Sequence, residues 1–354
     1  MEIGNKIKQL RYKAGLTQEQ LGAKLGISAQ SVSKWETAIT MPDITLLPTL
    51  ASELGVTIDD LFDLTTDQRL QRIEKRLDLE EEFPTDVFKE YETFLKNQLD
   101  ESKDKTKILS LLAHLYHHRM EADSRRVSRY AREAIMESPE KKDCQWLLQK
   151  AEGAHIWDWN IANHTAIIDF YKNVIESDTE SPKTPLPYYE IMDNLIADHR
   201  TREATQYLEI CQTLPSHKPF LIPVYKAHIA LAEYDEKMAD TIIETALKSY
   251  SDHSGFLFEA AQYYARKCAY EKAIEYYERS WKTEVDHKPR FTDALHGISV
   301  IYELLGDYKH ATETYDRLIT CLKDEWGYSD NDAAVIEAER QKSRLLKQLN
   351  EQHK

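Results

Sequence analysis

The sequence predicts an all-α protein with a small N-terminal domain, linker helices and a long array of helical hairpins. Three observations predict this fold. Apolar residues recur at helical spacing along most of the 354-residue chain. Five of the ten glycines lie in the first 55 residues, so tight turns concentrate there. In the C-terminal half, small and aromatic residues recur every 34 to 38 residues, which is typical of stacked helix pairs.

The composition fits a chain with an ordinary soluble core, since 42% of the residues are hydrophobic and 30% are charged. No apolar run approaches the ~20 residues that cross a bilayer, and the first ten residues lack the apolar stretch of a secretory signal. The cysteines are far apart and form no CxxC pair: Cys144, Cys211, Cys268 and Cys321. We therefore expect free thiols and a cytoplasmic protein.

The net charge of −15 is unevenly distributed along the chain. Residues 1–42 carry six Lys or Arg against three acidic residues, whereas the remainder is acidic. A locally basic N-terminus is compatible with a DNA-binding domain despite the acidic total, because the field at a DNA groove depends on nearby charge.

Three short helices are expected to follow one another closely near the N-terminus. The first ends before Gly15, and a capping box of Thr17 and Gln20 begins the second. Gly26 ends the second helix, and Ser28 caps the third. Two helices joined by so short a turn predict a helix-turn-helix.

The third helix has an inward and an outward face. Val32 and Trp35 should point into the core. The outward positions are small or polar: Ala29, Gln30, Ser31, Ser33 and Lys34. Such a face can enter a major groove, where amide and ammonium groups reach base edges and phosphates.

The segment LTQEQLGAKLGISAQSVSKWETAITMPDITLLPTLASELGVTIDDLF resembles the Cro/C-repressor, or xenobiotic-response-element, class of helix-turn-helix domains, and the resemblance runs over residues 7–62. It implies a five-helix repressor-type domain over residues 1–64, with its motif at about 17–36. By position in that family, Gln30 and Lys34 would read base edges, and Ala29 would reach at most a thymine methyl group. The residues implied to contact phosphates are Thr17, Gln18, Ser28 and Ser31.

Three further positions match the family in different ways. Arg11 and Glu36 match a pair that is ion-paired beneath the recognition helix in relatives, so we interpret them as structural. Ala38 stands where glycine is frequent, and it costs about 1 kcal/mol if the left-handed turn is kept. As an alternative, the outward face of the third helix is a solvated surface of a domain that only dimerises.

The rest of the chain predicts linker helices over 65–102, a solenoid of about six hairpins over 103–330 and a capping helix over 331–354. The clearest unit, TDALHGISVIYELLGDYKHATETYDRL, resembles a tetratricopeptide repeat, which implies a right-handed solenoid. Looser pairs are expected near 105–137, 143–176 and 187–214. The small residue of the second helix recurs at Ala204, Ala239, Ala273 and Ala311.

In such a solenoid the first helix of each pair lines the concave side. The repeat places aromatic and polar residues on that face: Tyr189, Asp193, His228, Phe258, Gln262, Arg266, His296 and Glu303. A groove of this character suits an extended peptide. Alternatively, each of these residues is an ordinary surface or packing residue.

Catalytic and metal sites are not expected. The sequence has no GxGxxG, P-loop, HExxH or GxSxG motif. His114, His117 and His118 share one helix face but lack a convincing fourth ligand, so we expect neither a metal nor a cofactor. Trp157 and Trp159 should pack within a helical element. The sequence therefore does not indicate an enzyme.

A repressor-class domain followed by tetratricopeptide-like repeats resembles the peptide-sensing quorum regulators of Gram-positive bacteria. The resemblance implies a homodimer that binds double-stranded DNA at a two-fold-related operator and a short signalling peptide in the groove. Two alternatives remain open. One is a repressor whose repeats bind a protein partner, such as an anti-repressor or a toxin, and the other is a scaffold without DNA binding.

Overall fold

The computed structural model describes residues 3–56, 58, 61–62, 65–101, 105–140, 142–152, 163–177, 184–284 and 287–352, and every regular element in these ranges is helical. The prediction of an all-α protein is confirmed. The chain divides into two compact units, residues 1–126 and 127–354, and the division falls inside one long helix. Each unit is described separately below.

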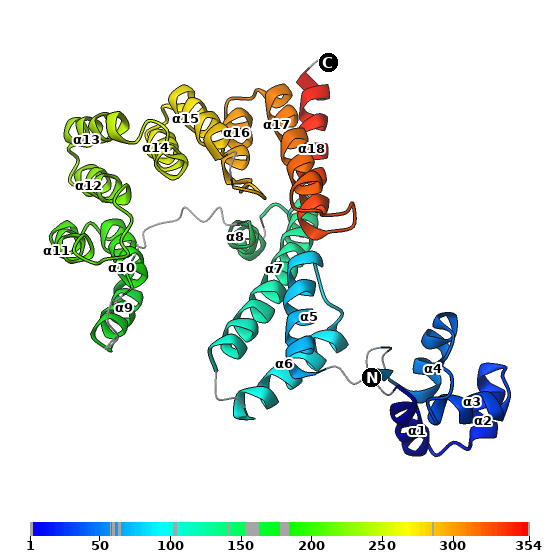
Figure 1. Ribbon diagram of the computed structural model, residues 1–354. Helices are drawn as coiled ribbons and strands as arrows, with labels where there is room; N and C mark the ends of the chain where they lie inside the picture. Colours follow the sequence, from blue (N-terminus) through cyan, green and yellow to red (C-terminus); the bar gives the residue numbers. More distant parts are fainter. Residues whose placement is uncertain are drawn as a thin grey trace. The chain divides into compact units, whose positions relative to one another are not determined.

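The first unit begins with a bundle of short helices, drawn in dark blue in Figure 1. Their bounds are α1 Ile3–Lys13, α2 Gln18–Leu25, α3 Ala29–Glu36, the 3-10 turn η1 Ile44–Leu46 and α4 Leu47–Leu54. Apolar side chains from all of the α-helices meet in one core that includes Ile7, Leu21, Val32 and Leu50. The segment expected to form a fifth helix lies largely outside the described residues.

Gly4 allows α1 to pack directly against the end of α3. A Cβ atom at this position would lie 2.0 Å from the carbonyl oxygen of Trp35, closer than any side chain can approach. Trp35 is itself 5% exposed, as the sequence predicts. The close contact sets α3 on α1 and leaves the opposite face of α3 outside the core.

Three longer helices complete the first unit: α5 Thr66–Leu79, α6 Thr85–Glu101 and α7 Lys105–Glu137, of which only α7 continues into the second unit. Leu70, Phe88, Leu95 and Leu115 contribute to their shared core. Arg76 joins α5 to α6 by bonding to Glu80 and, at 2.5 Å, to the hydroxyl of Tyr91.

The hairpin expected at 105–137 is wrong, because α7 is a single helix of 33 residues. Its sequence contains no glycine, proline or asparagine, so the residues that most strongly interrupt a helix are absent. The apolar spacing that indicated two helices is the inward stripe of one.

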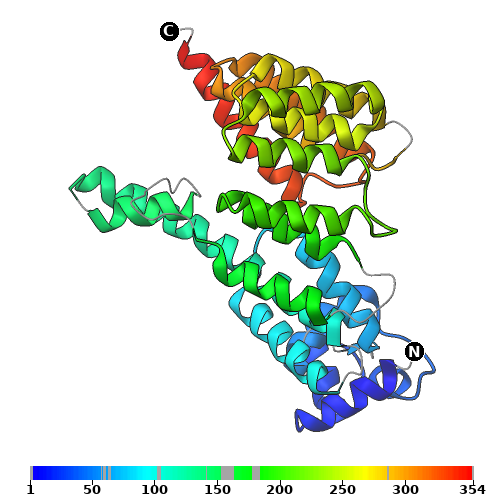
Figure 2. The same cartoon turned by 90° about the vertical axis from the view of Figure 1, so that its left-hand side faces the viewer.

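The second unit holds the helices that follow: α8 Lys142–Ala151, α9 Thr165–Ser177, α10 Leu186–Ala197, α11 Thr201–Cys211, α12 Leu221–Ala232, α13 Glu236–Ser249, α14 Ser254–Arg266, α15 Tyr270–Thr283, α16 Asp293–Leu304, α17 Tyr308–Asp324 and α18 Ala333–Gln352. From α10 to α17 they pair in sequence as hairpins, which lie side by side in Figure 1 and Figure 2. The last helix, α18, packs on α17. Trp157 and Trp159 lie outside the described residues.

Each hairpin turn repeats the same backbone conformation. A residue with positive φ stands at His199, Tyr234, Cys268 and Gly306 in the four turns between α10 and α17. Five residues later comes the alanine that recurs in the second helix, and all four alanines are fully buried. The alanine lets the two helices approach closely, so the turn and the small residue together define the repeat.

Aromatic and aliphatic side chains fill the spaces between successive hairpins. One core joins α9 to α12 around Ile191, Met192 and Leu195. A second core joins α12 to α18 around Phe256, Tyr263 and Leu295. Among the described residues, no helix is both long and apolar enough to span a bilayer.

Candidate DNA interface and ligand groove

The turn between α2 and α3 has the capping that the sequence predicts. The Thr17 hydroxyl accepts a hydrogen bond from the Gln20 amide at 3.1 Å, and the Gln20 side chain accepts one from the Thr17 amide at 2.8 Å. Gly26 ends α2 in the left-handed region at φ 68°, and Ser28 caps α3 by accepting from the Ser31 amide at 3.2 Å. These caps hold two helix N-termini in fixed positions.

The structure places the residues implied to contact DNA on accessible parts of α2 and α3. Gln30 and Lys34 are exposed, while Val32 between them is fully buried. The remaining five are exposed or half-buried: Thr17, Gln18, Ser28, Ala29 and Ser31. Their contacts with bases and phosphates stay predictions.

A buried ion pair supports α3 from below. The Arg11 guanidinium donates to both carboxylate oxygens of Glu36, at 2.5 and 3.0 Å, and to the Leu16 carbonyl at 2.7 Å. The side chains of Arg11 and Glu36 are 5% and 2% exposed. Burial alone would raise the pKa of Glu36, but hydrogen bonds from Arg11 and Gln18 hold that pKa below its ordinary value. The carboxylate therefore stays ionised and paired.

Gln18 has a contact that the sequence analysis missed. Its side-chain amide donates to Glu36 at 2.8 Å, which ties the first residue of α2 to the last residue of α3. One amide hydrogen of Gln18 is thus committed within the domain, so the predicted phosphate contact would have to use the second. The pairing joins residues 18 positions apart, so no local sequence signal predicts it.

Ala38 adopts the left-handed conformation that the sequence analysis considered, at φ 57°. Its amide donates to the Trp35 carbonyl at 3.0 Å, and the Ile39 amide donates to the Lys34 carbonyl at 2.9 Å. The turn thus closes the C-terminus of α3 although the residue is not glycine, at a cost of about 1 kcal/mol.

The first helices of the hairpins line hollows on one side of the second unit. Seven of the eight residues expected in the groove line two of these hollows: Asp193, His228 and Arg266 in one, and Phe258, Gln262, His296 and Glu303 in the other. Tyr189 lines neither. Its ring is 8% exposed and stacks on Tyr225 at 5.8 Å, and its hydroxyl accepts from the Lys218 amide at 2.8 Å.

The first hollow has a volume of about 470 Å³ and mixes charged with apolar walls. Asp193 is open to solvent, but the surrounding walls desolvate it and raise its pKa to about 6. Burial and, to a smaller extent, the charge of Arg266 lower the pKa of His228 to about 4. At neutral pH the hollow therefore holds a carboxylate, a neutral imidazole and a guanidinium.

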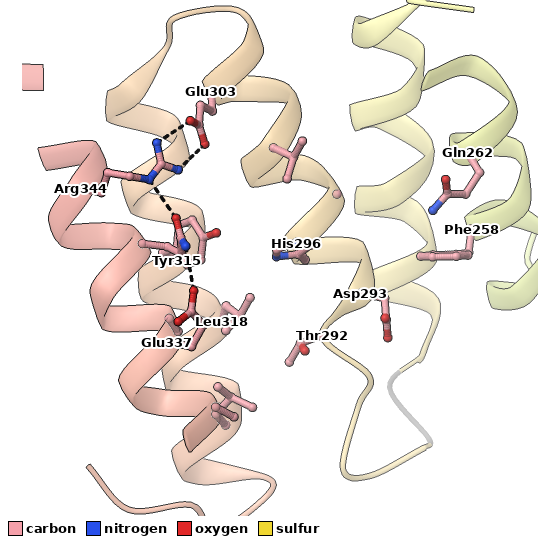
Figure 3. Close-up of a pocket in the computed structure, with 16 residues that line it drawn as sticks. Phe258, Gln262, Thr292, Asp293, His296, Glu303, Tyr315, Leu318, Glu337 and Arg344 are labelled. Carbon is pink, nitrogen blue, oxygen red and sulfur yellow. Dashed lines mark hydrogen bonds and ion pairs between the residues drawn. The ribbon is translucent and has the colours of Figure 1, made fainter. Parts of the chain in front are cut away.

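The second hollow has a volume of about 550 Å³ and is drawn in Figure 3. His296 and Glu303 reach it from α16, and Phe258 and Gln262 from α14. Arg344 on α18 donates to both carboxylate oxygens of Glu303, at 2.6 and 2.7 Å. This pair closes one end of the hollow, and it lowers the pKa of Glu303.

Several groove residues lay outside the sequence analysis. Tyr315, Glu337 and Arg344 come from α17 and α18, whereas the repeat pattern assigned only first helices to the groove. A third hollow of about 310 Å³ adds Lys218 and Glu259 among its lining residues. Burial raises the pKa of Glu259, and the nearby charge of Asp193 raises it further.

The histidines of α7 serve other contacts. His117 faces Glu121 at 3.9 Å, and His118 stacks on Phe83 at 4.5 Å between ring centroids. Within the described part of the chain, no three His, Cys, Asp or Glu residues are grouped as metal ligands.

Comparison with known proteins finds similar sequences for the N-terminal segment. Residues 7–61 match a family model described as helix-turn-helix. Over 62 residues the chain is 40% identical to the HTH-type transcriptional activator BcrR of Enterococcus faecalis. That match covers 18% of this chain and spans only 30% of the length of BcrR.

Solved structures with low sequence identity align along much more of the chain. Bacillus thuringiensis PlcR in complex with the peptide PapR7 and DNA is 13% identical, with 97% of this chain and 98% of that chain covered and a TM-score of 0.26. The Streptococcus dysgalactiae SHP pheromone receptor Rgg2 is 13% identical, with 78% and 99% covered and a TM-score of 0.26. At TM-scores this low, the likeness adds nothing to what the helices of this chain show by themselves.

Proposed function

We propose that this protein is a sequence-specific DNA-binding transcriptional regulator whose helical repeats sense a ligand, a short peptide. The observation that supports DNA binding is the arrangement of α3. Gln30 and Lys34 are exposed on a helix that is capped at its start and ion-paired beneath its end. A rigid helix with a polar outer face is what major-groove recognition needs.

The sensing half of the proposal is supported by the hollows along the hairpins. Their volumes lie within the range of about 300–1,000 Å³ that is usual for ligand sites. They combine aromatic walls with charged groups, as an extended chain of amino acids would require. BcrR, to which the N-terminal segment is similar, is a transcriptional activator.

A homodimer is part of the proposal. Two helix-turn-helix domains related by a two-fold axis would bind half-sites about one helical turn apart. A ligand with different affinity for two arrangements of the protein would shift the balance between them, and so change the affinity for DNA.

Selection from random-sequence duplex DNA tests the DNA-binding half. The full-length protein should enrich one inverted repeat, with half-site centres ~10 base pairs apart. Gln30→Ala and Lys34→Ala should each weaken binding to that sequence by about 1–3 kcal/mol, and Gln30→Ala should relax specificity at one base pair.

Two control variants remove a glutamine amide and a lysine ammonium group at positions outside α3. Gln9→Ala lies on an exposed position of α1, and Lys309→Ala lies on α17 in the second unit. Both should bind the selected DNA like the parent protein. Failure to enrich any sequence, or equal losses in the α3 and control variants, would contradict DNA reading by α3.

A further inference from the structure

The hollow around Asp193, His228 and Arg266 holds polar groups that the described parts of the protein leave without strong partners. Arg266 forms no hydrogen bond or ion pair with another residue in the described ranges, and its charge acts on Asp193 and His228 only at longer range. Arg344, Arg317 and Arg290 in the same unit each pair with a glutamate. Arg266 therefore differs from these arginines in having its guanidinium free within a cavity.

The imidazole of His228 presents a second unmatched group. Its Nε2 atom is buried and has no hydrogen-bond partner among the described residues. A buried polar atom without a partner destabilises the protein, so a ligand atom that bonds to it removes that penalty. As the Nε2–H tautomer, His228 is a donor, and Arg266 carries five more.

The remaining walls complete the chemistry of the hollow. The Asp193 carboxylate lies near the hydroxyl of Tyr225, which donates to the Tyr189 carbonyl at 3.5 Å, so the carboxylate retains capacity for a donor. Ile196, Ala197 and Leu231 supply apolar surface. The hollow thus offers donors for an anion, an acceptor for an N–H group and an apolar wall within about 470 Å³.

We infer that this hollow holds the C-terminal residue of the bound peptide, with its α-carboxylate on Arg266 and His228 and its backbone N–H on Asp193. The apolar side chain of that residue packs on Ile196 and Leu231. The inference rests on the proposed peptide sensing and names the part of the peptide that this end of the groove selects.

A C-terminal carboxylate fits the hollow better than an N-terminal ammonium. Two cavity groups, Arg266 and His228, can donate to an anion, and a guanidinium takes both oxygens of a carboxylate at once. An ammonium would find acceptors in Asp193 and in the Nε2 atom of His199, whose Nδ1 donates to the Ala232 carbonyl, but it would also lie in the repulsive field of Arg266. A free carboxylate bonded in this way binds tighter than an uncharged amide.

Two pools of random heptapeptides test the inference, one with a free C-terminal carboxylate and one with a C-terminal carboxamide. Each pool is incubated with the full-length protein, and the retained peptides are identified by mass spectrometry. Every retained peptide is then synthesised once with a C-terminal carboxylate and once with a C-terminal carboxamide, and both forms are titrated by calorimetry. The carboxylate form should bind about tenfold or more tightly than the carboxamide form.

Variants of Arg266 test whether this hollow causes the preference for a C-terminal carboxylate. Arg266→Gln should weaken binding of the carboxylate form about tenfold or more and leave the carboxamide form unchanged. Arg266→Lys keeps the charge but loses the two-pronged geometry, so its loss should be intermediate. The control Arg202→Gln removes an exposed arginine on α11 that lines none of the three hollows, and it should bind both forms like the parent protein.

The outcomes separate this inference from the proposed function. If peptides are retained but both C-terminal forms bind equally, the carboxylate site is wrong while peptide sensing stands. If Arg266→Gln weakens both forms alike, the carboxylate is not bound by Arg266 and the inference fails. If neither pool yields a peptide, the proposed peptide sensing is contradicted, and so is this inference, which depends on it.

Discussion

The helix-turn-helix domain and the groove differ in whether their polar groups have partners within the protein. In the domain, Arg11, Glu36 and Gln18 satisfy one another within the core. In the groove, Arg266 and the Nε2 atom of His228 have no partner among the described residues. A fully hydrogen-bonded network holds a binding surface rigid, whereas polar groups without partners in a hollow can form hydrogen bonds with a ligand.

The largest expected effect follows from breaking the network in the domain. Glu36→Ala leaves the Arg11 guanidinium buried without its carboxylate, so the domain should lose about 3–5 kcal/mol of folding free energy. Hydrogen exchange of the full-length protein, read by mass spectrometry, should show fast exchange within residues 3–56 and unchanged protection in α14 to α17.

A double variant controls for lost packing. Arg11→Met with Glu36→Leu removes both charges and keeps similar volumes, so most of the protection should return. Normal protection in Glu36→Ala would show that the pair does not support the domain.

An ion pair outside the hollows gives a smaller, pH-dependent effect. Arg290 donates to Glu325 from its guanidinium and its backbone amide, which lowers the pKa of Glu325 to about 2 from an ordinary 4.5. Because the folded pKa is depressed, the stabilisation is complete above about pH 4.5 and is lost as the pH falls towards 2.

Glu325→Gln removes that stabilisation at neutral pH. We expect a loss of about 1.5–3 kcal/mol at pH 7. Thermal unfolding between pH 7 and pH 2.5 should show a shallower pH dependence in the variant than in the parent protein. Parallel curves for the two proteins would contradict the assigned pair.

Glycine substitutions in the left-handed turns of both regions should stabilise the protein, in contrast to the destabilising variants above. Ala38→Gly in the domain and Tyr234→Gly in a hairpin relieve a left-handed conformation, so each should stabilise the protein by up to about 1 kcal/mol. The converse change, Gly306→Ala, should destabilise it by about the same amount. Melting temperatures measure all three, and a stabilising Gly306→Ala would refute the argument.

The smallest effect is expected in the groove. Arg266→Ala removes an exposed cation that has no partner among the described residues, so folding stability should change by less than about 0.5 kcal/mol. Denaturant unfolding checks this. A loss as large as that of Glu36→Ala would mean that Arg266 belongs to the structure rather than to a ligand site.

The sequence predicts what depends on neighbours along the chain. The caps at Thr17 and Ser28 follow from residue type and spacing, and the recurring alanines follow from the repeat. The left-handed Ala38 was implied only by the resemblance to the repressor class. The repeat also placed seven of the eight residues expected in the groove along a hollow, although it named only a minority of the lining residues.

Features that depend on distant partners could not be predicted in this way. Gln18 meets Glu36 through the fold of three helices, and Arg344 reaches Glu303 across 41 positions. Tyr189 has the register of a groove residue, but stacking on Tyr225 buries it. For α7 the sequence analysis made a different error. It interpreted one inward-facing apolar stripe as two helices, although no glycine, proline or asparagine indicated a turn between them.

The most direct test of the account measures whether the groove and the DNA-binding domain communicate. The affinity of the full-length protein for its selected operator is measured by fluorescence anisotropy, with and without a saturating peptide from the selection. We predict a change of about fivefold or more, and an equal change in peptide affinity when the operator is saturating. An operator affinity that stays the same at saturating peptide would contradict a regulator whose repeats sense the ligand for the DNA-binding domain.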